Sequence, residues 1–509
     1  IRGKCELIMI YWMIICLLYL AYLSGVQAEV IVPESEVYAL QVFWDSTDGS
    51  RWSYHEAETG EWDFSDGLQS NPCLPSWQGI TCSCVTEELN HYCTVTMLKL
   101  SRFDLRGYIP EQLSGLVNLT TIDFSVNHLR RTMPSTIGAL GQLTSLDVSV
   151  NEMVGMIPSE IGNLYDLQHF VIEGNKFNGT VPGFLCQLHE MVMLKMSANL
   201  LTGSIPDCIG NLHQLDRLNV EANFLTNTLP SQIGSLSSLT YLNIGYNVLI
   251  NGSFPSEICN LDKLVLLDIA INRLSGTVPS CIGNLKDLTY IDMFYNLLTS
   301  TLPPSMLTLD KMFKMYVDYN YITGPIPSEI YMLTNLVSFG VDQNDMSGTL
   351  PSAWPANIQH LWIQSNFFSG SIVESLVNIT NCLELVANFN DFTGTIPSIL
   401  ANLAQLEYFD VSNNYIVGEI PSSFSNMLNL QYLYAKRNSL TCGNIMEFVC
   451  NSVEQLDISE NLYSGTFPFH ATGSSITNLY IRGNYYSGSI PNQDLVLLSH
   501  IRNLDLSSN

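Results

Sequence analysis

The sequence predicts an α/β repeat solenoid in which every turn adds one short strand to a parallel sheet. Two observations lead to this prediction. A strand-like pattern of leucines that ends in an asparagine returns along most of the chain, and the commonest step between copies is 24 residues. Most copies also carry a glycine four residues after the asparagine. A fixed period of about 20 to 50 residues indicates a solenoid.

The copy that ends at Asn151 illustrates one turn. Leu146 and Val148 are two residues apart, so in a strand they point to the same side, into the coil. Asp147 and Ser149 alternate with them and are therefore expected to face outward. A buried asparagine side chain offers one acceptor and two donors. A column of stacked asparagines can thus satisfy the backbone groups of neighbouring turns.

The asparagine is predicted to form a continuous buried ladder along the array. Its members are Asn127, Asn151, Asn175, Asn199, Asn223, Asn247, Asn272, Asn296, Asn320, Asn344, Asn366, Asn390, Asn414, Asn438, Asn461, Asn484 and Asn509. After Asn151, Gly155 allows a positive φ at a tight bend. Pro158 then fixes its own φ and offers no N–H to a neighbour.

These residues resemble the plant-type leucine-rich repeat, L-x-x-L-x-L-x-x-N-x-L-x-G-x-I-P, over about residues 96 to 509. The copies depart from this pattern at Phe103 in place of asparagine, Arg131 and Ser300 in place of glycine, residues 372–373 without proline, and residues 442–444 in place of Gly-x-Ile-Pro. The resemblance implies a leucine-rich-repeat superhelix. Its parallel sheet lies on the concave side, and short helices, 3-10 turns and loops lie on the convex side.

Three regions are expected: a signal peptide at residues 1–28, a cysteine-containing cap at 29–95 and the repeat array at 96–509. Residues 7–23 are almost all apolar, follow Arg2 and Lys4, and precede small residues that end at Ala28, as in a secretory signal. An uncleaved anchor helix is the alternative, although 17 residues is short for a membrane span. The array stops within a repeat, so we expect it to continue beyond Asn509.

The cap region resembles the cysteine-bearing caps that precede extracellular leucine-rich repeats. A helix is expected after residues 33–35, because Val37, Leu40 and Phe43 recur at helical spacing, and Asp48 with the following glycine is expected to end it. The tryptophans of this region are expected to cover the open apolar end of the first turn. A binding role for them is the alternative.

The cysteines predict disulfides, which fit a secreted chain. Cys186 and Cys208 follow the prolines of adjacent turns, and Cys259 with Cys281 repeats that relation. Adjacent turns are about 4.8 Å apart, within the reach of a disulfide. The predicted pairs are Cys73–Cys82, Cys84–Cys93, Cys186–Cys208, Cys259–Cys281 and Cys442–Cys450, although four cap cysteines allow three connectivities. Cys382 is expected to be a buried free thiol, with a metal site as the alternative.

Four sequons are candidate glycosylation sites in a secreted chain: Asn118, Asn178, Asn251 and Asn378. None falls on an outward strand position, so the concave sheet is expected to stay free of sugar. The formal net charge of −27 would repel nucleic acid and anionic lipid and attract basic partners. Membrane contact is expected only through an uncleaved N-terminal segment or through a span after Asn509.

Aromatic residues gather at the outward strand positions of the middle turns, six, four, two and one residues before the ladder asparagine. The predicted ligand-binding residues are Tyr241, Tyr246, Tyr290, Asp292, Phe294, Tyr295, Tyr316, Asp318, Tyr319, Asp342 and Trp362. A second aromatic group is Tyr408, Tyr432, Tyr434 and Tyr480. Exposed aromatics on a rigid sheet are candidate anchors for a ligand. The alternative is that they pack across the strands.

No catalytic, cofactor or metal site is predicted. Aspartates recur four residues before the asparagine, but calcium needs six to eight converging oxygens, so a solvated repeat feature is the preferred interpretation. The sequence lacks a zinc-helix motif, a G-x-S-x-G motif and a phosphate-binding loop. An enzyme is therefore not expected from these residues, although a kinase domain after Asn509 would be compatible with them.

Two function classes follow from the resemblance. The first is a receptor-like binding ectodomain, secreted or at the cell surface, that takes a peptide, glycan or protein ligand on its concave face and has a co-receptor as a further partner. The second is a secreted inhibitor of wall-degrading enzymes or a structural glycoprotein of a wall or matrix. Fold alone does not choose between them.

Overall fold

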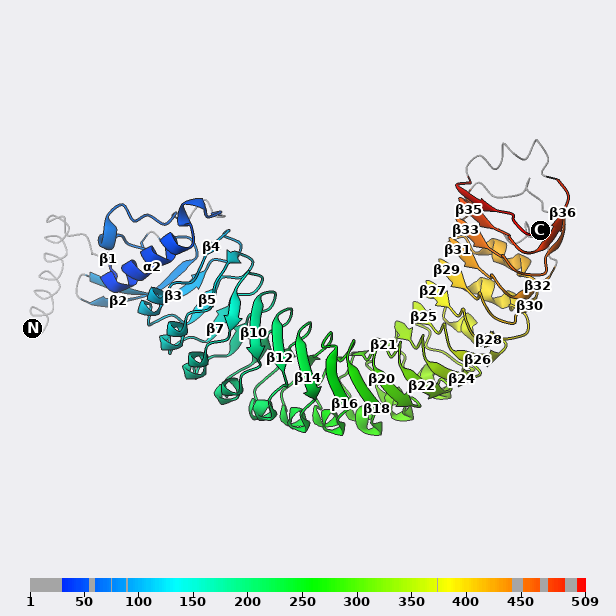
Figure 1. Cartoon of the computed structure of the whole chain (residues 1–509), viewed down its shortest axis with the longest axis horizontal. Coiled ribbons are helices and arrows are strands. Elements are labelled where there is room, and N and C mark those ends of the chain that lie inside the picture. Colours follow the sequence, from blue (N-terminus) through cyan, green and yellow to red (C-terminus); the bar gives the residue numbers. More distant parts are fainter. Residues whose placement is uncertain are drawn as a thin grey trace, which may run out of the picture. The chain divides into compact units, whose positions relative to one another are not determined.

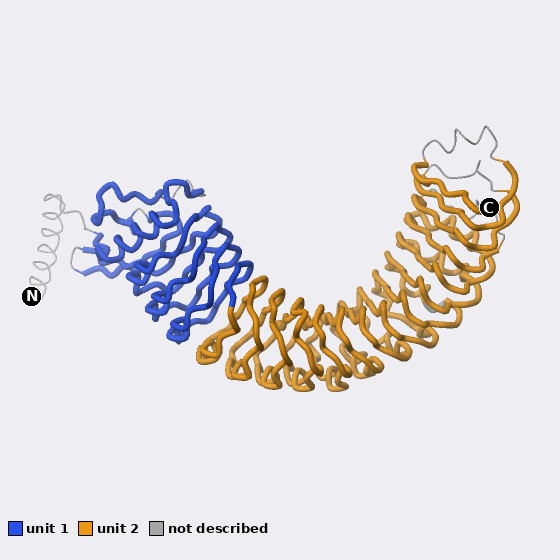
Figure 2. Tube along the Cα trace, in the orientation of Figure 1, with its two compact units in different colours: residues 1–178 blue, residues 179–509 orange. Residues whose placement is uncertain are grey.

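The computed structural model describes residues 30–54, 60–74, 76–87, 90–372, 374–441, 452–466, 475–489 and 501–509. Two compact units divide the chain, residues 1–178 and residues 179–509 (Figure 2). The expected signal peptide and the expected Cys442–Cys450 pair lie outside the described residues. Among the described helices, none combines the length and the apolar character that a membrane span needs.

Unit 1 begins with the cap and its one α-helix, α2 (Glu34–Ser46), as the sequence predicted (Figure 1). Asp48 adopts the left-handed conformation with φ 58°, which ends the helical path. Trp52, Trp62 and Phe43 are buried against one another, with the Trp52 and Trp62 rings 4.8 Å apart. The ring of Phe43 stacks on Phe124 of the first turns at 4.8 Å. These contacts confirm the packing interpretation of the cap.

The cap tryptophans also use their polar edges within the cap. Trp52 Nε1 donates to the carbonyl of Thr47 at 3.1 Å, and Trp62 Nε1 donates to the carbonyl of Gln78 at 2.9 Å. A buried indole N–H normally finds such a partner. These indoles are therefore structural and not available as ligand anchors.

In unit 1 the strands form a main sheet and short lateral pairs. The main sheet contains β1 (Val30–Ile31), β2 (Ile80–Glu87), β3 (Asn90–Lys99), β5 (Thr121–Asp123), β7 (Ser145–Asp147) and β9 (His169–Val171). The lateral strands are β4 (Arg106–Gly107), β6 (His128–Leu129) and β8 (Val154–Met156), and β10 (Lys176–Thr180) crosses the unit boundary. Only β2 and β3 pair antiparallel among the described strands of this sheet.

In unit 2 the inner sheet is purely parallel and each turn contributes one strand of three residues. Its described strands are β11 (Met193–Lys195), β13 (Arg217–Asn219), β15 (Tyr241–Asn243), β17 (Leu266–Asp268), β19 (Tyr290–Asp292), β21 (Lys314–Tyr316), β23 (Ser338–Gly340), β25 (His360–Trp362), β27 (Glu384–Val386), β29 (Tyr408–Asp410), β31 (Tyr432–Tyr434), β33 (Gln455–Asp457), β35 (Asn478–Tyr480) and β37 (Asn503–Asp505). Equivalent residues of adjacent turns are paired, for example Tyr290 with Lys314.

A second sheet of unit 2 follows each ladder asparagine. Its strands are β12 (Leu200–Gly203), β14 (Phe224–Thr228), β16 (Leu249–Ser253), β18 (Arg273–Thr277), β20 (Leu297–Ser300), β22 (Tyr321–Gly324), β24 (Asp345–Gly348), β26 (Phe367–Gly370) and β28 (Asp391–Phe392). Two further pairs are β30 (Val417–Gly418) with β32 (Ser439–Leu440) and β34 (Ser464–Thr466) with β36 (Tyr485–Ser487). In unit 2, the odd-numbered labels from β25 to β35 mark inner-sheet strands and lie inside the curve. The even-numbered labels from β22 to β32 mark the strands that follow the ladder asparagines and lie outside it (Figure 1).

Short 3-10 helices occur in the cap and in the array. Those of the array connect the second strands back to the inner sheet, as expected for the convex side. They are η1 (Gly49–Arg51) and η2 (Gly67–Gln69) in the cap, and η3 (Glu111–Gly115), η4 (Ser135–Ala139), η5 (Ser159–Asn163), η6 (Gly183–Gln187), η7 (Asp207–Asn211), η8 (Ser231–Ser235), η9 (Ser256–Asn260), η10 (Ser280–Asn284), η11 (Pro304–Thr308), η12 (Ser328–Met332), η13 (Glu374–Asn378), η14 (Ser398–Asn402) and η15 (Ser422–Asn426) in the array. A proline such as Pro279 precedes most of them, because its fixed φ suits the start of a helical turn.

The asparagine ladder is present, although Asn438 is only half-buried, Asn509 is exposed and the Oδ1 atom of Asn272 accepts no hydrogen bond from a described residue. Asn223 lies in the interior, donates through Nδ2 to the carbonyls of Met196 and Val220 at 3.0 and 3.1 Å, and accepts from the N–H of Leu201 at 3.0 Å. Leucines and isoleucines fill the space beside it, so each turn buries its own apolar residues. This arrangement needs no single large core.

The glycine position after the asparagine requires a positive φ. Gly276 and Gly324 have φ of 79° and 76°, and Arg131 and Ser300, which replace this glycine, are forced to 64° and 72°. Residues other than glycine, asparagine and aspartate rarely adopt this conformation. The two substitutions therefore place strain in the backbone without changing the path of the turn.

Candidate functional site

The inner-sheet strands are shorter than the period-two pattern predicted, and this changes which residues face outward. Each strand ends four residues before the asparagine, and the burial of the residue two before it differs between turns: Ser149 is buried, Phe294 is half-buried and Arg482 is exposed. Ser149 was predicted to face outward but is buried. The reason is local: Asp147 Oδ1 accepts hydrogen bonds from the backbone N–H and the hydroxyl of Ser149, at 2.8 and 2.6 Å. The aspartate thereby caps the end of the strand and holds the Ser149 side chain against itself.

The same hydrogen bond explains the recurrent aspartates. Asp268 accepts from the N–H of Ala270 at 3.0 Å, and Asp292 accepts from the N–H of Phe294 at 2.9 Å. They are caps at strand ends, so their function is structural and not only solvation. No group of three or more metal-ligating side chains occurs among the residues that the structure describes.

Burial raises the pKa of these carboxyls. The pKa of Asp268 rises to about 7, mainly because the group is desolvated and secondarily because Asp292 and Glu221 lie nearby. Asp292, beside it in register, also has a raised pKa for the same main reason. The hydroxyl of Tyr290 donates to Asp292 Oδ2 at 2.9 Å. This part of the sheet therefore combines partly desolvated carboxyls with a phenol.

An aromatic cluster covers the middle of the inner sheet. The rings of Tyr290 and Tyr316 meet edge to face at 6.0 Å, and those of Tyr316 and Trp362 stack at 5.9 Å and 24°. Trp362 Nε1 donates to Glu384 at 3.0 Å. Tyr316 and Trp362 come from turns that are two apart, with Gly340 between them in register. The missing side chain at Gly340 leaves room for the two rings to stack.

Both interpretations of these aromatics therefore hold in part. Tyr290, Tyr316 and Trp362 pack across strands, as the structural interpretation predicted, yet each remains half-exposed on the inner face. Tyr241 is also half-exposed but stands apart, because Leu266 follows it in register. A second cluster forms where Tyr408 contacts Tyr432 at 5.7 Å and Tyr434 at 5.4 Å.

Asp318 and Asp342, two of the predicted ligand-binding residues, are buried rather than exposed on the sheet. Their exposed fractions are 5% and 9%, and Asp318 Oδ1 accepts the backbone N–H of Asp342 at 3.0 Å. Both lie two residues before a ladder asparagine, and the Asp318 carboxyl occupies the space beside Gly340. Desolvation, the hydrogen bond with Asp342 and its charge raise the pKa of Asp318 to about 9. Asp318 therefore keeps its proton near neutral pH, and burial also raises the pKa of Asp342.

Tyr246, Tyr295 and Tyr319 lie beyond the ends of the inner-sheet strands. Each directly precedes a ladder asparagine and has a positive φ of 52° to 55°, so it stands at the edge where the chain leaves the sheet. Phe294 links the two surfaces, with its ring 5.2 Å from that of Tyr319. The edge tyrosines are well exposed.

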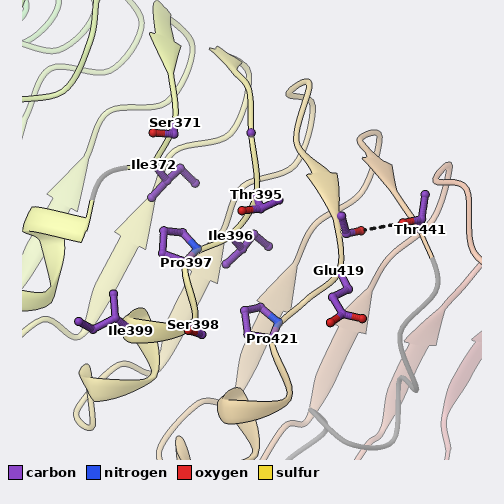
Figure 3. A pocket seen from close by; sticks show the side chains of 12 residues that line it. Ser371, Ile372, Thr395, Ile396, Pro397, Ser398, Ile399, Glu419, Pro421 and Thr441 are labelled. Carbon is purple, nitrogen blue, oxygen red and sulfur yellow. Dashed lines mark hydrogen bonds between the residues drawn. The ribbon is translucent and has the colours of Figure 1, made fainter.

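A further cleft lies away from these residues. It has a volume of about 1090 Å³ and is lined by Gly-x-Ile-Pro segments, including Ile396, Pro397 and Pro421, with Glu419 and Thr441 at its far side (Figure 3). No inner-sheet residue lines it. Sequence reasoning did not find this cleft, because the repeat pattern is intact around Pro397 and Pro421.

The covalent features agree with an oxidising compartment. Disulfides join Cys73–Cys82, Cys84–Cys93, Cys186–Cys208 and Cys259–Cys281, which confirms four predicted pairs. Cys382 is a buried free thiol, as predicted, and burial raises its pKa to about 12. Such a thiol is not reactive.

The four sequons all lie outside the inner-sheet strands. Asn178, Asn251 and Asn378 are exposed, in β10, β16 and η13. Asn118 is half-buried, and its side chain hydrogen-bonds the carboxylate of Glu36 in the cap helix. The inner sheet is thus free of candidate glycan positions, as the sequence indicated.

Comparison with known proteins places this geometry in a family. Residues 238–261 and 405–427 match the Leucine Rich Repeat family model. No curated protein sequence matches the chain. The chain is similar to the plant peptide hormone receptor RGFR1, solved with RGF2, at 30% identity and a TM-score of 0.78, covering 80% of this chain and 65% of that one.

Two Arabidopsis structures are also similar. The receptor kinase HAESA, in complex with the peptide hormone IDA and the co-receptor SERK1, is 28% identical with a TM-score of 0.75, covering 93% of this chain and 82% of that one. The ectodomain of GASSHO1/SCHENGEN3, in complex with CASPARIAN STRIP INTEGRITY FACTOR 2, is 25% identical with a TM-score of 0.64, covering 93% and 64%. The chain thus spans about two thirds of the RGFR1 and GASSHO1 chains. The repeat motif, the fold and these similarities together show a plant-type leucine-rich repeat ectodomain, similar to the ectodomains of plant receptor kinases.

Proposed function

We propose that the chain is the ligand-binding part of a receptor-like protein and binds an extended peptide along the inner sheet of unit 2. The aromatic cluster of Tyr290, Tyr316 and Trp362 is the observation that carries this proposal. These rings are half-exposed, held rigidly by one another, and free of candidate glycan positions. Large aromatics held on a rigid surface are the usual anchors of a binding interface.

The dimensions suit a short peptide. The turns that end at Asn247 and Asn366 are five steps apart, which is about 24 Å at about 4.8 Å per step. An extended chain covers this length with about seven residues. Asp292, beside Tyr290, favours a hydroxyl or basic group on the ligand. Phe294 and the edge tyrosines Tyr295 and Tyr319 would contact the ligand at the rim of the sheet.

The similar structures support the class of ligand. RGFR1 and HAESA were each solved with a peptide hormone, and HAESA also with a co-receptor. We extend both roles to this chain, with a secreted peptide as ligand and a second extracellular protein as co-receptor. The disulfides support placement in the extracellular space.

The experiment uses peptides selected from a random twelve-residue display library on the immobilised chain. The affinity of the best selected peptide is then measured for wild type, Trp362→Ala and Tyr290→Ala. Each variant should bind at least tenfold more weakly, which corresponds to about 1.4 kcal/mol. Tyr331→Ala is the matched control, because Tyr331 is an exposed tyrosine on η12 and not on the inner sheet.

Melting temperatures of the same variants separate binding from folding. Each substitution removes ring contacts worth about 0.5–1.5 kcal/mol, so only a small decrease is expected. Unchanged affinity in both inner-sheet variants, or a weakening equal to that in Tyr331→Ala, would reject the proposed site. Failure to select any peptide that binds unit 2 would reject the peptide as ligand class.

A further inference from the structure

A separate cleft opens on the lateral side of unit 2, where the chain passes from the inner sheet to the second sheet. Its volume is about 270 Å³. Tyr295 and Tyr319, which precede their ladder asparagines, form one wall, and Leu297 and Tyr321, which follow them, form the other. The two asparagines at its floor use their amides within the ladder. The side chains that a ligand would meet are therefore mainly aromatic and aliphatic.

These four side chains are unusually exposed for their type. Their exposed fractions are 57% for Tyr295, 41% for Leu297, 42% for Tyr319 and 54% for Tyr321. The rings of Tyr295 and Tyr319 are 6.0 Å apart and inclined by 34°, so they present neighbouring faces. Contiguous exposed apolar surface of this kind indicates an interaction site.

The lining of the cleft carries no charge, and Gln343 at its end supplies an amide. Charged residues occur only one turn further on each side. Arg273 takes the position of Leu297 in the preceding turn, and Asp345 takes the position of Tyr321 in the following turn. Both are exposed, and neither forms an ion pair with a described residue. The apolar cleft is thus bounded by a positive and a negative end.

The stagger of the second sheet sets the spacing of these side chains. Tyr321 of β22 pairs with Thr299 of β20, which is two residues beyond Leu297. Two residues along a strand are about 6.6 Å and one strand step is about 4.8 Å, so the Cα atoms of Leu297 and Tyr321 are about 8 Å apart. Arg273 and Asp345 are three such steps apart, or about 24 Å.

We propose that this lateral cleft binds a proline-rich segment in the polyproline II conformation, with an acidic residue near Arg273 and a basic residue near Asp345. One turn of that helix has three residues and rises about 9.3 Å, close to the spacing of Leu297 and Tyr321. Prolines three residues apart would then lie on successive side chains. Proline-rich segments dock in aromatic-lined grooves because their conformation is formed before binding.

The backbone chemistry of such a ligand also fits. Polyproline II has no internal hydrogen bonds, so its carbonyls are free to accept from tyrosine hydroxyls and from the amide of Gln343. About eight residues at 3.1 Å span the distance between Arg273 and Asp345. Charges at the two ends would fix the direction of the segment. This site shares Tyr295 and Tyr319 with the rim of the proposed peptide site, but it is completed by Leu297 and Tyr321 and does not include Tyr290, Tyr316 or Trp362.

The test measures binding of the synthetic peptide acetyl-Glu-(Pro)7-Arg-amide to the full chain by titration calorimetry. We expect wild type to bind and Tyr321→Ala to bind at least tenfold more weakly. Tyr331→Ala and Trp362→Ala should bind as wild type, because neither residue lines the cleft. Asp345→Asn should weaken the binding of this peptide. It should not weaken the binding of acetyl-Glu-(Pro)7-Gln-amide, and this difference would assign the basic end of the ligand to Asp345.

The contradicting results are equally specific. Absence of binding to wild type, or equal binding by wild type and Tyr321→Ala, overturns the inference. Binding of cellohexaose that Tyr321→Ala abolishes, with no binding of the peptide, also overturns it, because the rings would then stack on sugar. Loss of affinity in Trp362→Ala would place the peptide on the inner sheet and overturn the lateral site.

Discussion

The Oδ1 atom of Asp318 accepts a hydrogen bond from the backbone N–H of Asp342 at 3.0 Å, and both side chains are buried beneath the aromatic cluster of the inner sheet. Gly340 makes this possible, since a Cβ on that residue would overlap the Asp318 carboxyl. The same missing side chain lies between Tyr316 and Trp362 in register. The absence of a side chain at Gly340 therefore makes room both for the Asp318 carboxyl and for the stacking of Tyr316 on Trp362.

The first prediction concerns pH. The pKa of Asp318 is raised from 3.8 to about 9 in the folded chain, so folding retains a proton that the unfolded chain releases at an acidic pH. Wild-type stability should therefore fall as the pH rises from about 4 towards 9. Asp318→Asn mimics the protonated form and should escape this loss. Its melting temperature, compared with wild type, should be similar at pH 4.5 and higher at pH 8.

Asp310→Asn serves as the control, because Asp310 is an exposed aspartate of the same turn. Its difference from wild type should not grow with pH. A difference in melting temperature between Asp318→Asn and wild type that does not change with pH would contradict the assignment of a buried Asp318 that keeps its proton.

The second prediction concerns Gly340→Ala. The added methyl group meets the carboxyl of Asp318, so the variant should lose about 1–3 kcal/mol of unfolding free energy, typical of overpacking. Gly141→Ala, where nothing lies within 4 Å of the added carbon, should be nearly neutral. Denaturant unfolding measures both.

A double-variant cycle identifies the cause. Asp318→Ala removes the group that the methyl meets, so Gly340→Ala should cost less in that background than in wild type. Additive effects of the two substitutions would show that the contact is not responsible for the loss.

The third prediction concerns the ladder. Asn223→Ala leaves the N–H of Leu201 and the carbonyls of Met196 and Val220 without this partner. Each buried group left unpaired costs about 1–3 kcal/mol, so the melting temperature should decrease clearly. Asn211→Ala, at an exposed asparagine of the preceding 3-10 segment, should melt like wild type. Equal melting of the two variants would refute a stabilising ladder.

The fourth prediction concerns the disulfides between turns. Cys186–Cys208 and Cys259–Cys281 each close a loop with a sequence separation of 22. Loops of this length contribute about 3 kcal/mol of stability in the chain-entropy account. Non-reducing peptide mapping should recover both linked pairs, and Cys186→Ala with Cys208→Ala should lower the melting temperature. Recovery of these cysteines as free thiols would contradict the covalent structure.

The repeat sequence predicted the features that recur identically in every turn. The ladder, the buried thiol of Cys382 and the inter-turn disulfides follow from position alone, because equivalent residues of the inner sheet are paired in register. The outward positions did not follow. The period of two was extended to Asp318 and Asp342, whereas the strand stops two residues earlier and these two carboxyls are buried.

Two parts of the surface depend on differences between turns, which a repeat pattern hides. Gly340 replaces a side chain in one turn and thereby permits the stacking of Tyr316 on Trp362. The lateral cleft arises from a stagger between β20 and β22 that the sequence period does not indicate. Exposed residues just after the ladder asparagines, such as Tyr321, were the one available signal for it.

The most direct test of ligand binding on the inner sheet is photocrosslinking at a single position. Tyr316→p-benzoylphenylalanine places a reactive group at the centre of the aromatic cluster, and Tyr331→p-benzoylphenylalanine places it on η12. After irradiation with the peptide selected on the wild-type chain, mass spectrometry measures the crosslinked fraction. We predict a crosslink from position 316 that excess unlabelled peptide abolishes, and none from position 331. Equal crosslinking at both positions, or none at position 316 while the peptide remains bound, would contradict a binding site on the inner sheet.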